Sequence, residues 1–446
     1  MNRLRQWIAD GLVDTVIVAG IDMQGRLYGK RCVADIFLRD MAEGVHTCDC
    51  NFGWDVARML IDGLDFTGWH KGYGDMTIKP DWSTLRHYAW FDKTVLLIGD
   101  TVDHHGHPVS VAPRSVLRKQ VEKARAMGFE AMMAPEVEFF LFRETLESSR
   151  KKDYRDLQPM SEYISDYCVF RSSMDEWIIG QMRRKLTESN VEVESYKAEW
   201  GFGQCEMNLR YTHALEMADR HVVYKHAIRE IAALNQCQAT FMAKWDSKHS
   251  GNGSHVHVSL WEGERPAFPG NGPHGMSDTA RHFMGGMMHL AKDLQLFCAP
   301  TINSYKRYED LSFAPTTITW GGDNRTTAFR IAGHGNSMRI ENRIPGSDAC
   351  AHLLYGAMLG AGLYGIEHKL EPIGPFVQAN AYIETDAPKL NRTLEQTALA
   401  MEQSKAARRI LGDDVVDHYV RVARWEVEEY NKHVTDWERR RYFELI

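Results

Sequence analysis

The pattern of apolar positions in the first hundred residues predicts short strands joined by tight turns. The segment TVIVAGIDMQGRLYGKRCVA (15–34) is typical of two strands around a turn at Gln24-Gly25, and it follows a short charged helix at about 2–12. Further short strands are predicted within 72–90 and 94–103. Because long helical periodicity is absent, residues 1–105 are predicted to form a hairpin-rich domain.

From Pro113 the pattern changes to mixed helices and strands. Residues 113–128, PRSVLRKQVEKARAMG, predict an amphipathic helix with proline near its start and Gly128 at its end. The small-residue segment 356–370 and the chain from about 390 onward also predict helices. The polar, Gly- and Pro-containing segment 104–115 is the best boundary, so a second domain is expected over 106–446.

Composition narrows the class of protein. The chain has 446 residues, a formal net charge of −7 and eight scattered cysteines that fit neither a disulfide framework nor a zinc site. The acidic balance gives no reason to expect nucleic acid or anionic membrane as a partner. An apolar run approaching the roughly 18 residues of a membrane span is also missing from the sequence. A cytoplasmic protein without membrane or nucleic-acid partners is predicted.

Chemistry-bearing residues recur on single faces of predicted strands. In GNGSHVHVSL (251–260), His255 and His257 point the same way, and an exposed polar face would explain them equally well. In APEVEFFLF (134–142), Glu136 and Glu138 share one face of a strongly apolar strand. Two carboxylates buried there would be costly without compensating cations.

Four further segments supply acidic and basic residues in a similar pattern. EWGFGQCE (199–206) predicts a hairpin that returns Glu199 toward Glu206, and MRIENRI (338–344) alternates Arg339, Glu341 and Arg343 with apolar residues. The remaining arginines are Arg307, Arg325 and Arg330. Carboxylates with a histidine suit Mg²⁺ or Mn²⁺, and arginines facing such metals suit a polyphosphate. No P-loop motif is present. The residues therefore predict a metal-dependent phosphoryl-transfer enzyme.

Six ordered motifs carry a resemblance to the type I glutamine synthetase family. They are E-x-E at 136–138, E…GQ-x-E at 199–206, G-x-G-x-H-x-H at 251–257, N-S-Y-K-R at 303–307, N-R-x₄-R at 324–330 and R-x-E-x-R at 339–343. The resemblance implies an α+β fold, with an N-terminal β-grasp domain and a catalytic domain whose curved antiparallel sheet is flanked by helices. It also implies a homo-oligomer of stacked hexameric rings with active sites shared between neighbours.

The resemblance implies a role for each matching residue. One metal would be held by Glu138, Glu199 and Glu206, and a second by Glu136, His255 and Glu341, with two or three Mg²⁺ or Mn²⁺ ions per subunit. Glutamate would contact Gly251, Arg307 and Arg343, and ATP would contact His257, Ser259, Arg325, Arg330 and Arg339. Arg325, Arg339 and Arg343 would act catalytically. The implied reaction phosphorylates the γ-carboxylate of glutamate with ATP, and an amine then attacks the γ-glutamyl phosphate.

The chain departs from the family where ammonia would bind. The loop after N-S-Y-K-R has Phe313 where the family carries a glutamate before Ala-Pro, and the N-terminal D-G-S-S motif is missing. A phenyl ring offers an apolar wall instead of a charge, which favours an organic amine and resembles the γ-glutamylamide (glutamate–amine ligase) branch. Glu309, Asp310 and Asp49 remain alternative bases. An ordinary glutamine synthetase using ammonia, and a non-catalytic ring protein, are the alternative functions.

Overall fold

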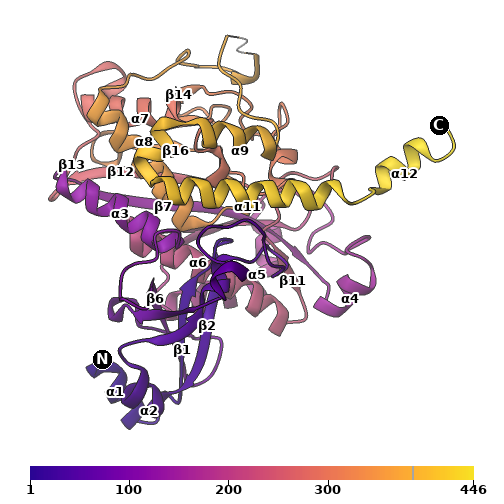
Figure 1. Cartoon of the computed structure of the whole chain (residues 1–446). Helices are drawn as coiled ribbons and strands as arrows, with labels where there is room; N and C mark the ends of the chain where they lie inside the picture. Colours follow the sequence, from indigo (N-terminus) through magenta and orange to yellow (C-terminus); the bar gives the residue numbers. More distant parts are fainter. Residues whose placement is uncertain (384–385) are drawn as a thin grey trace.

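The computed structural model describes residues 1–383 and 386–446. Strands β1–β6 of the N-terminal region form one β-sheet and β7–β16 form a second (Figure 1). The first sheet has the order β2-β1-β6-β4-β3, with β5 paired to β6. Its central strands β1 and β6 are parallel and the other pairs are antiparallel. The strands are β1 Thr15–Ile21, β2 Leu27–Val33, β3 Val45–Cys48, β4 Asp75–Pro80, β5 Arg86–His87 and β6 Thr94–Val102.

The second sheet is ten-stranded and has the order β14-β15-β16-β12-β7-β9-β8. The strands β10 and β11 pair with β7, and β13 pairs with β12. The expected antiparallel arrangement holds except for β14 and β15, which run parallel. The strands are β7 Glu130–Phe142, β8 Val193–Ala198, β9 Gln204–Leu209, β10 Thr212–His213, β11 Gln238–Thr240, β12 Ser254–Glu262, β13 Arg265–Pro266, β14 Trp320–Gly322, β15 Phe329–Ala332 and β16 Arg339–Asn342.

Helices cover the apolar face of this second sheet. The helices α3 and α6 pack against β7, α5 packs against β8, and α8 packs against α3, α6 and α7. The α-helices are α1 Asn2–Ala9, α2 Ala34–Ile36, α3 Pro113–Ala126, α4 Leu146–Lys151, α5 Val169–Glu188, α6 Ala214–Leu234, α7 Asp278–His289, α8 Ala351–His368, α9 Leu394–Gln403, α10 Lys405–Leu411, α11 Asp413–Asn431 and α12 Asp436–Tyr442.

The alternation along β7 positions the candidate site. Val137 and Phe139 are fully buried on the helical side, where the Tyr224 hydroxyl of α6 donates a hydrogen bond to the Val137 carbonyl at 3.1 Å. Because neighbouring side chains of a strand point to opposite faces, Glu136 and Glu138 project from the other face. The sheet thus buries its apolar residues under helices and leaves its acidic residues on the open side.

The α+β class predicted from the sequence is confirmed, with local differences. The first helix ends at Ala9 instead of residue 12, and α3 begins at Pro113 and ends just before Gly128, whose φ is +88°. The boundary expected at residue 105 falls between β6 and α3, and the division into two domains stays a prediction. In the part of the chain that the structure describes, every helix is too short or too polar to cross a membrane.

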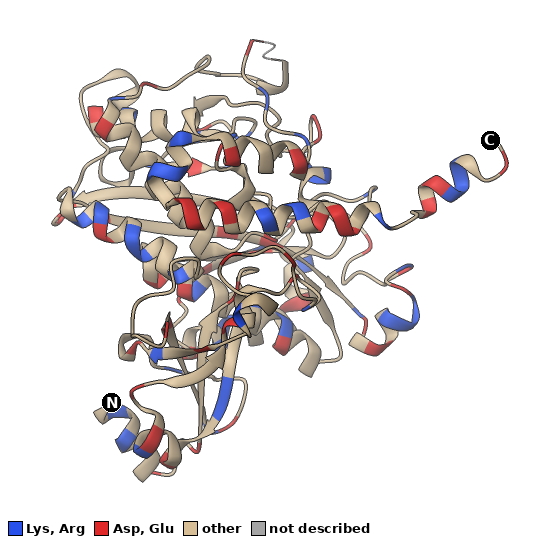
Figure 2. Cartoon of the chain, in the orientation of Figure 1, with Lys and Arg blue, Asp and Glu red and all other residues tan. Residues whose placement is uncertain are grey.

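The C-terminal helices lie on the surface. The long helix α11 runs across the molecule and α12 projects away from it (Figure 1). Both helices carry acidic and basic side chains interspersed along their length (Figure 2). Trp437, Phe443 and Ile446 at the projecting end are nevertheless exposed.

Candidate active site

Strand register brings the acidic residues of the open sheet face together. The strands β9, β7, β12 and β16 are neighbours in the sheet, so residues distant in sequence face one another across adjacent strands. Directly opposed residues in an antiparallel pair have Cβ atoms about 4.5–5.5 Å apart. The facing pairs are Glu138–Glu206, Glu136–His255 and His257–Glu341.

The first group consists of Glu138, Glu199 and Glu206, whose carboxylate oxygens lie within 4.8 Å of one another. Burial, reinforced by the Glu199 carboxylate, raises the pKa of Glu138 from 4.5 to about 8. Burial and the carboxylates of Glu136, Glu199 and Glu138 also raise the pKa of Glu206 well above its ordinary value. Three carboxylates that repel one another, with Glu206 buried and Glu138 and Glu199 half-buried, form a site that a divalent cation would neutralise.

Two residues that the sequence prediction missed organise this group. The Gln204 side-chain amide donates to Glu138 Oε2 at 3.1 Å and to the Gly251 carbonyl at 3.0 Å. The Lys197 ammonium pairs with Glu199 and lies 3.2 Å from Asp166. Sequence signals for both residues were present. Gln204 belongs to the E…GQ-x-E motif, and Lys197 lies two residues before Glu199, so the two side chains are expected on the same side of an extended chain.

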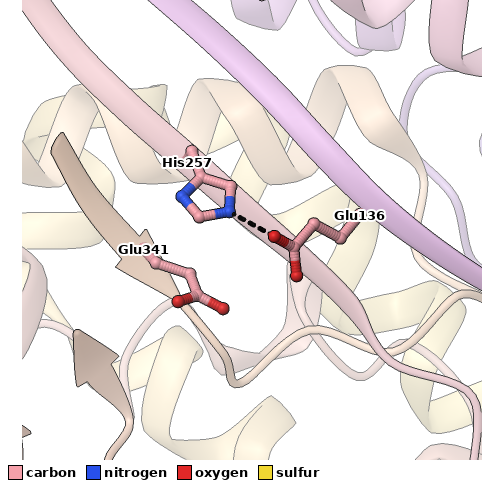
Figure 3. A group of neighbouring side chains, drawn as sticks. All are labelled: Glu136, His257 and Glu341. Carbon is pink, nitrogen blue, oxygen red and sulfur yellow. Dashed lines mark hydrogen bonds and ion pairs between the residues drawn. The ribbon is translucent and has the colours of Figure 1, made fainter. Parts of the chain in front are cut away.

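The second group consists of Glu136, His257 and Glu341 (Figure 3). The His257 Nε2 atom lies 2.9 Å from Glu136 Oε1. The expected histidine of this group, His255, stands beside it, with Nδ1 at 3.4 Å from Glu136 Oε2 and 3.7 Å from Glu341 Oε1. Because both imidazoles project from the same face of β12, either can reach Glu136. The choice between them stays a prediction.

Electrostatics in the second group favour ionised carboxylates and a neutral imidazole. Burial opposes ionisation of Glu136, but hydrogen bonding to His255 and His257 holds its pKa below the ordinary value. Burial likewise opposes ionisation of Glu341, but Arg343 lowers its pKa to about 2. Burial and the Arg343 charge lower the pKa of His255 to about 4. A neutral imidazole beside carboxylates is the form in which histidine binds metals.

Three of the four arginines expected near phosphate or the γ-carboxylate converge here. Arg343 Nη1 lies 2.5 Å from Glu341 Oε1, and Arg330 Nη1 lies 2.8 Å from Glu341 Oε2. Arg339 Nε lies 3.2 Å from His257 Nδ1. The fourth arginine, Arg325, is exposed on the loop between β14 and β15. Its predicted contact with ATP stays a prediction.

The expected glutamate contacts lie on the same open face. Arg307 is 4% exposed and donates a hydrogen bond from Nη2 to the Ile344 carbonyl, while its Nε has no acceptor among the described residues. A Cβ at Gly251 would stand 2.4 Å from Arg307 Cγ, so only glycine fits there. Ser259 lies two residues beyond His257 on β12 and accepts a hydrogen bond from Trp261 at 3.0 Å. Its predicted role toward ATP stays untested.

Phe313 lies on a strained loop that follows Arg307 in the chain. Its φ of +60° is in the left-handed region, which is rare for an aromatic residue, and its side chain is 56% exposed. The Tyr382 hydroxyl donates to the Ala314 carbonyl at 3.0 Å and anchors the loop. Burial raises the pKa of Tyr382 to about 12, and the charges of Arg343 and Arg307 oppose that shift.

The three alternative bases are all engaged in hydrogen bonds or ion pairs. Glu309 Oε2 lies 3.2 Å from the Lys244 ammonium, and Asp310 accepts a hydrogen bond from Thr316 at 2.9 Å. Asp49 accepts a hydrogen bond from Thr67 at 2.7 Å in the N-terminal region.

A comparison with known protein families identifies the family of the chain. Residues 110–442 match the family described as glutamine synthetase, catalytic domain. The chain belongs to the glutamine synthetase family. Enzymes of this family are ATP-dependent and use divalent metals, and the oxygen-rich donor groups on the sheet fit such ions.

Curated relatives and solved structures match over essentially the whole chain. A gamma-glutamylethanolamide synthetase, GlnA4, of Streptomyces coelicolor is 40% identical over 100% of this chain and 96% of its own. A glutamate–isopropylamine ligase of a Pseudomonas species is 37% identical over 100% of this chain and 98% of its own. A structure titled as apo GmaS without ligand has a TM-score of 0.85 and 28% identity, covering 100% of both chains.

Removal of divalent metal should make the stability of this glutamine synthetase family member fall with rising pH. Between 4.5 and about 8, folded Glu138 keeps a proton that the unfolded chain has lost. This proton binding favours the fold at low pH, and the advantage is lost as pH rises through the folded pKa. We therefore expect Tm in EDTA to drop across this window.

Scanning fluorimetry with EDTA and with Mg²⁺ checks this expectation. Mg²⁺ should raise Tm most at the high-pH end of the window, where the carboxylates are ionised. A Mg²⁺ effect of equal size at every pH would contradict the raised pKa of the first group.

Proposed function

We propose that this protein is an ATP-dependent glutamate–amine ligase that joins the γ-carboxylate of L-glutamate to a primary organic amine. Two relatives that match the whole chain are named as a gamma-glutamylethanolamide synthetase and a glutamate–isopropylamine ligase. Ethanolamine and isopropylamine are both primary organic amines. The observation that carries the proposal is Phe313, an exposed phenyl ring held at φ +60° where a charged residue would suit ammonium. Strain of this kind is retained where it serves a function.

The proposed reaction has two steps, and residues of the open face would take part in them. Transfer of the terminal phosphoryl group of ATP to a γ-carboxylate oxygen releases ADP and activates the carbonyl carbon toward a nucleophile. The amine nitrogen then forms a bond to that carbon, the bond to the phosphate oxygen breaks, and phosphate and a proton leave. Arg330, Arg339 and Arg343 surround the second group, where positive charge stabilises transferring phosphate. Arg307 would hold the α-carboxylate of glutamate.

Divalent metals fit the two groups, and we propose two or three Mg²⁺ or Mn²⁺ ions per subunit. Glu138, Glu199 and Glu206 would hold one ion, and Glu136 and Glu341 with His255 or His257 would hold another. When bound, such ions neutralise phosphate charge and polarise the phosphoryl oxygens. Retention of these buried carboxylates argues against a non-catalytic ring protein, because unpaired buried charge is costly.

We also propose that the protein is a cytoplasmic homo-oligomer built from stacked hexameric rings. Large apolar side chains exposed on and beyond the projecting helix α12, among them Trp437, Phe443 and Ile446, support self-association. Sharing of each active site between neighbours would place the N-terminal region of one subunit against the open face of another.

A product assay tests the proposed reaction directly. The protein is incubated with L-glutamate, ATP, Mg²⁺ and ethanolamine or isopropylamine, and the mixture is analysed by mass spectrometry. A product with the mass of glutamate plus amine minus water, formed only with ATP, is expected. Glutamine formed from ammonia, with no amide formed from either amine, would favour the ordinary glutamine synthetase instead.

Phe313→Glu should shift selectivity toward ammonia. A carboxylate at this position would attract ammonium and remove an apolar surface, and one methylene of apolar contact is worth about 1–3 kcal/mol. The ratio of kcat/KM for ethanolamine to that for ammonia should therefore fall by about 10-fold or more. Steady-state phosphate release with each acceptor measures the ratio.

Leu311→Glu is the matched control, since Leu311 is exposed on the same loop and also has a left-handed φ of +62°. That variant should leave the ratio unchanged. Equal losses with both acceptors in the Phe313 variant would mean that the ring only packs its loop.

A further inference from the structure

A cavity of about 470 Å³ lies away from the open sheet face. Its walls come from α6, α8, α11, the segment after β11 and the turn between β1 and β2. Among the described residues, the walls include no member of either acidic group. Apolar side chains dominate them, including Val222, Phe241, Leu353, Val422 and Trp425. A volume of this size is in the range of pockets that bind small molecules.

Two cations of the walls, Lys225 and Arg229, have no carboxylate in ion-pair contact among the described residues. The Lys225 ammonium donates to the Ser347 carbonyl at 2.6 Å and to the Ala349 carbonyl at 3.2 Å. Within residues 1–383 and 386–446, no carboxylate lies within 4.0 Å of Lys225 or of Arg229, which also lines the cavity. Burial lowers the pKa of Lys225 to about 8, a sign of a cation without full compensation.

The acidic residues of the walls are already satisfied or disfavour ionisation. Asp55 accepts a hydrogen bond from the Trp425 indole at 3.3 Å. Asp348 Oδ2 accepts from Ser304 at 2.5 Å, its Oδ1 has no donor among the described residues, and burial raises the pKa of Asp348. Burial raises the pKa of Glu426. The other basic residues of the walls, Arg26 and His226, contact carboxylates outside the cavity lining. The unmet charge is therefore positive, and the complementary ligand group is an anion.

The cavity shares a wall with the candidate active site through residues 346–349. The Ser347 hydroxyl donates to the Gly253 carbonyl at 2.6 Å, and the Gly253 amide donates to Glu138 Oε2 at 2.7 Å. Asp348, hydrogen-bonded to Ser304, lies in the same segment, and Ser304 belongs to the 303–307 segment that carries Arg307. A movement of residues 346–349 would therefore displace both the first acidic group and Arg307, the proposed glutamate contact.

We propose that this cavity is a second ligand site for a small amphipathic carboxylate, and that its occupancy changes glutamate binding. The carboxylate contacts Lys225 and Arg229, and the apolar body packs against Phe241, Leu353 and Trp425. Only the effect on glutamate rests on the proposed function. Binding itself does not.

Calorimetric titration of the full-length protein with 3-phenylpropionate tests the site. Saturating glutamate and a non-hydrolysable ATP analogue keep the active site filled. Saturable binding is expected for 3-phenylpropionate and not for acetate, which lacks the apolar body, or 3-phenylpropanol, which lacks the charge. Arg229→Met should weaken binding by about 10-fold or more, because a hydrogen bond to a charged group is lost. Val422→Trp should abolish binding by filling the cavity.

Arg184→Met, an exposed charge removal on α5, is the matched control and should bind the probe as wild type does. Binding that is absent, or that persists unchanged in both cavity variants, would overturn the site. In wild type the probe should change the KM for glutamate at least 2-fold, and Val422→Trp should be insensitive. Binding without any change in KM would overturn the coupling while leaving the proposed reaction untouched.

Discussion

Glu138→Ala is expected to lower kcat by about 1,000-fold or more while the protein stays folded. Glu138 faces Glu206 across the strand pair and shares the first group with Glu199, so its loss leaves two carboxylates where three would hold a cation. Metal-supplied charge stabilisation is worth several kcal/mol, and each 1.36 kcal/mol is tenfold in rate. Turnover at saturating Mg²⁺ measures the loss.

The folded state of this variant can be checked independently of its activity. Removal of one of three mutually repelling carboxylates should keep or raise Tm in EDTA, whereas the increase in Tm produced by Mg²⁺ should shrink. Glu194→Ala, an exposed change on strand β8 of the same sheet, should behave as wild type does. Near-normal turnover of Glu138→Ala with saturating Mg²⁺ would refute its assignment as a metal ligand.

Arg307→Lys is expected to raise the KM for glutamate by about 10- to 100-fold with a smaller effect on kcat. A guanidinium binds a carboxylate through two parallel hydrogen bonds, and an ammonium cannot form this bidentate pair. Each charged hydrogen bond is worth about 1.5–3 kcal/mol. The Nε of Arg307 lacks an acceptor among the described residues, which leaves a donor free for substrate.

The adjacent exposed residue supplies the control for Arg307. Lys306→Met removes a neighbouring charge and should leave the KM for glutamate unchanged. Initial rates at varied glutamate and fixed amine separate the two KM values. A rise in the KM for the amine alone would assign the α-carboxylate to a different residue.

Much of the site followed from local periodicity. The period of two along a strand predicts that Glu136 and Glu138 share a face, and the Gly-x-Gly turn predicts that Glu199 returns toward Glu206. The pairing of β12 with β16, which sets His257 opposite Glu341, depends on long-range register. Neither strand contains that information alone.

Other features depend on tertiary structure and could not be predicted. Both Arg330 and Arg343 reach Glu341, because burial makes each of its oxygens recruit a donor. Arg325 has the same motif support but lies exposed on its loop. The left-handed φ of Phe313 has no signal in the sequence, since glycine, asparagine or aspartate is the usual residue there. The second cavity is formed by elements far apart in the chain.

The preference of the wild-type protein between organic amines and ammonia decides whether it is a glutamate–amine ligase. ATP-dependent phosphate release is measured with saturating L-glutamate and Mg²⁺ while ethanolamine, isopropylamine, methylamine or ammonia is varied. We predict that kcat/KM for at least one organic amine exceeds that for ammonia by about 10-fold or more, as one or two methylenes of apolar contact allow. A higher kcat/KM for ammonia than for every organic amine would contradict the glutamate–amine ligase.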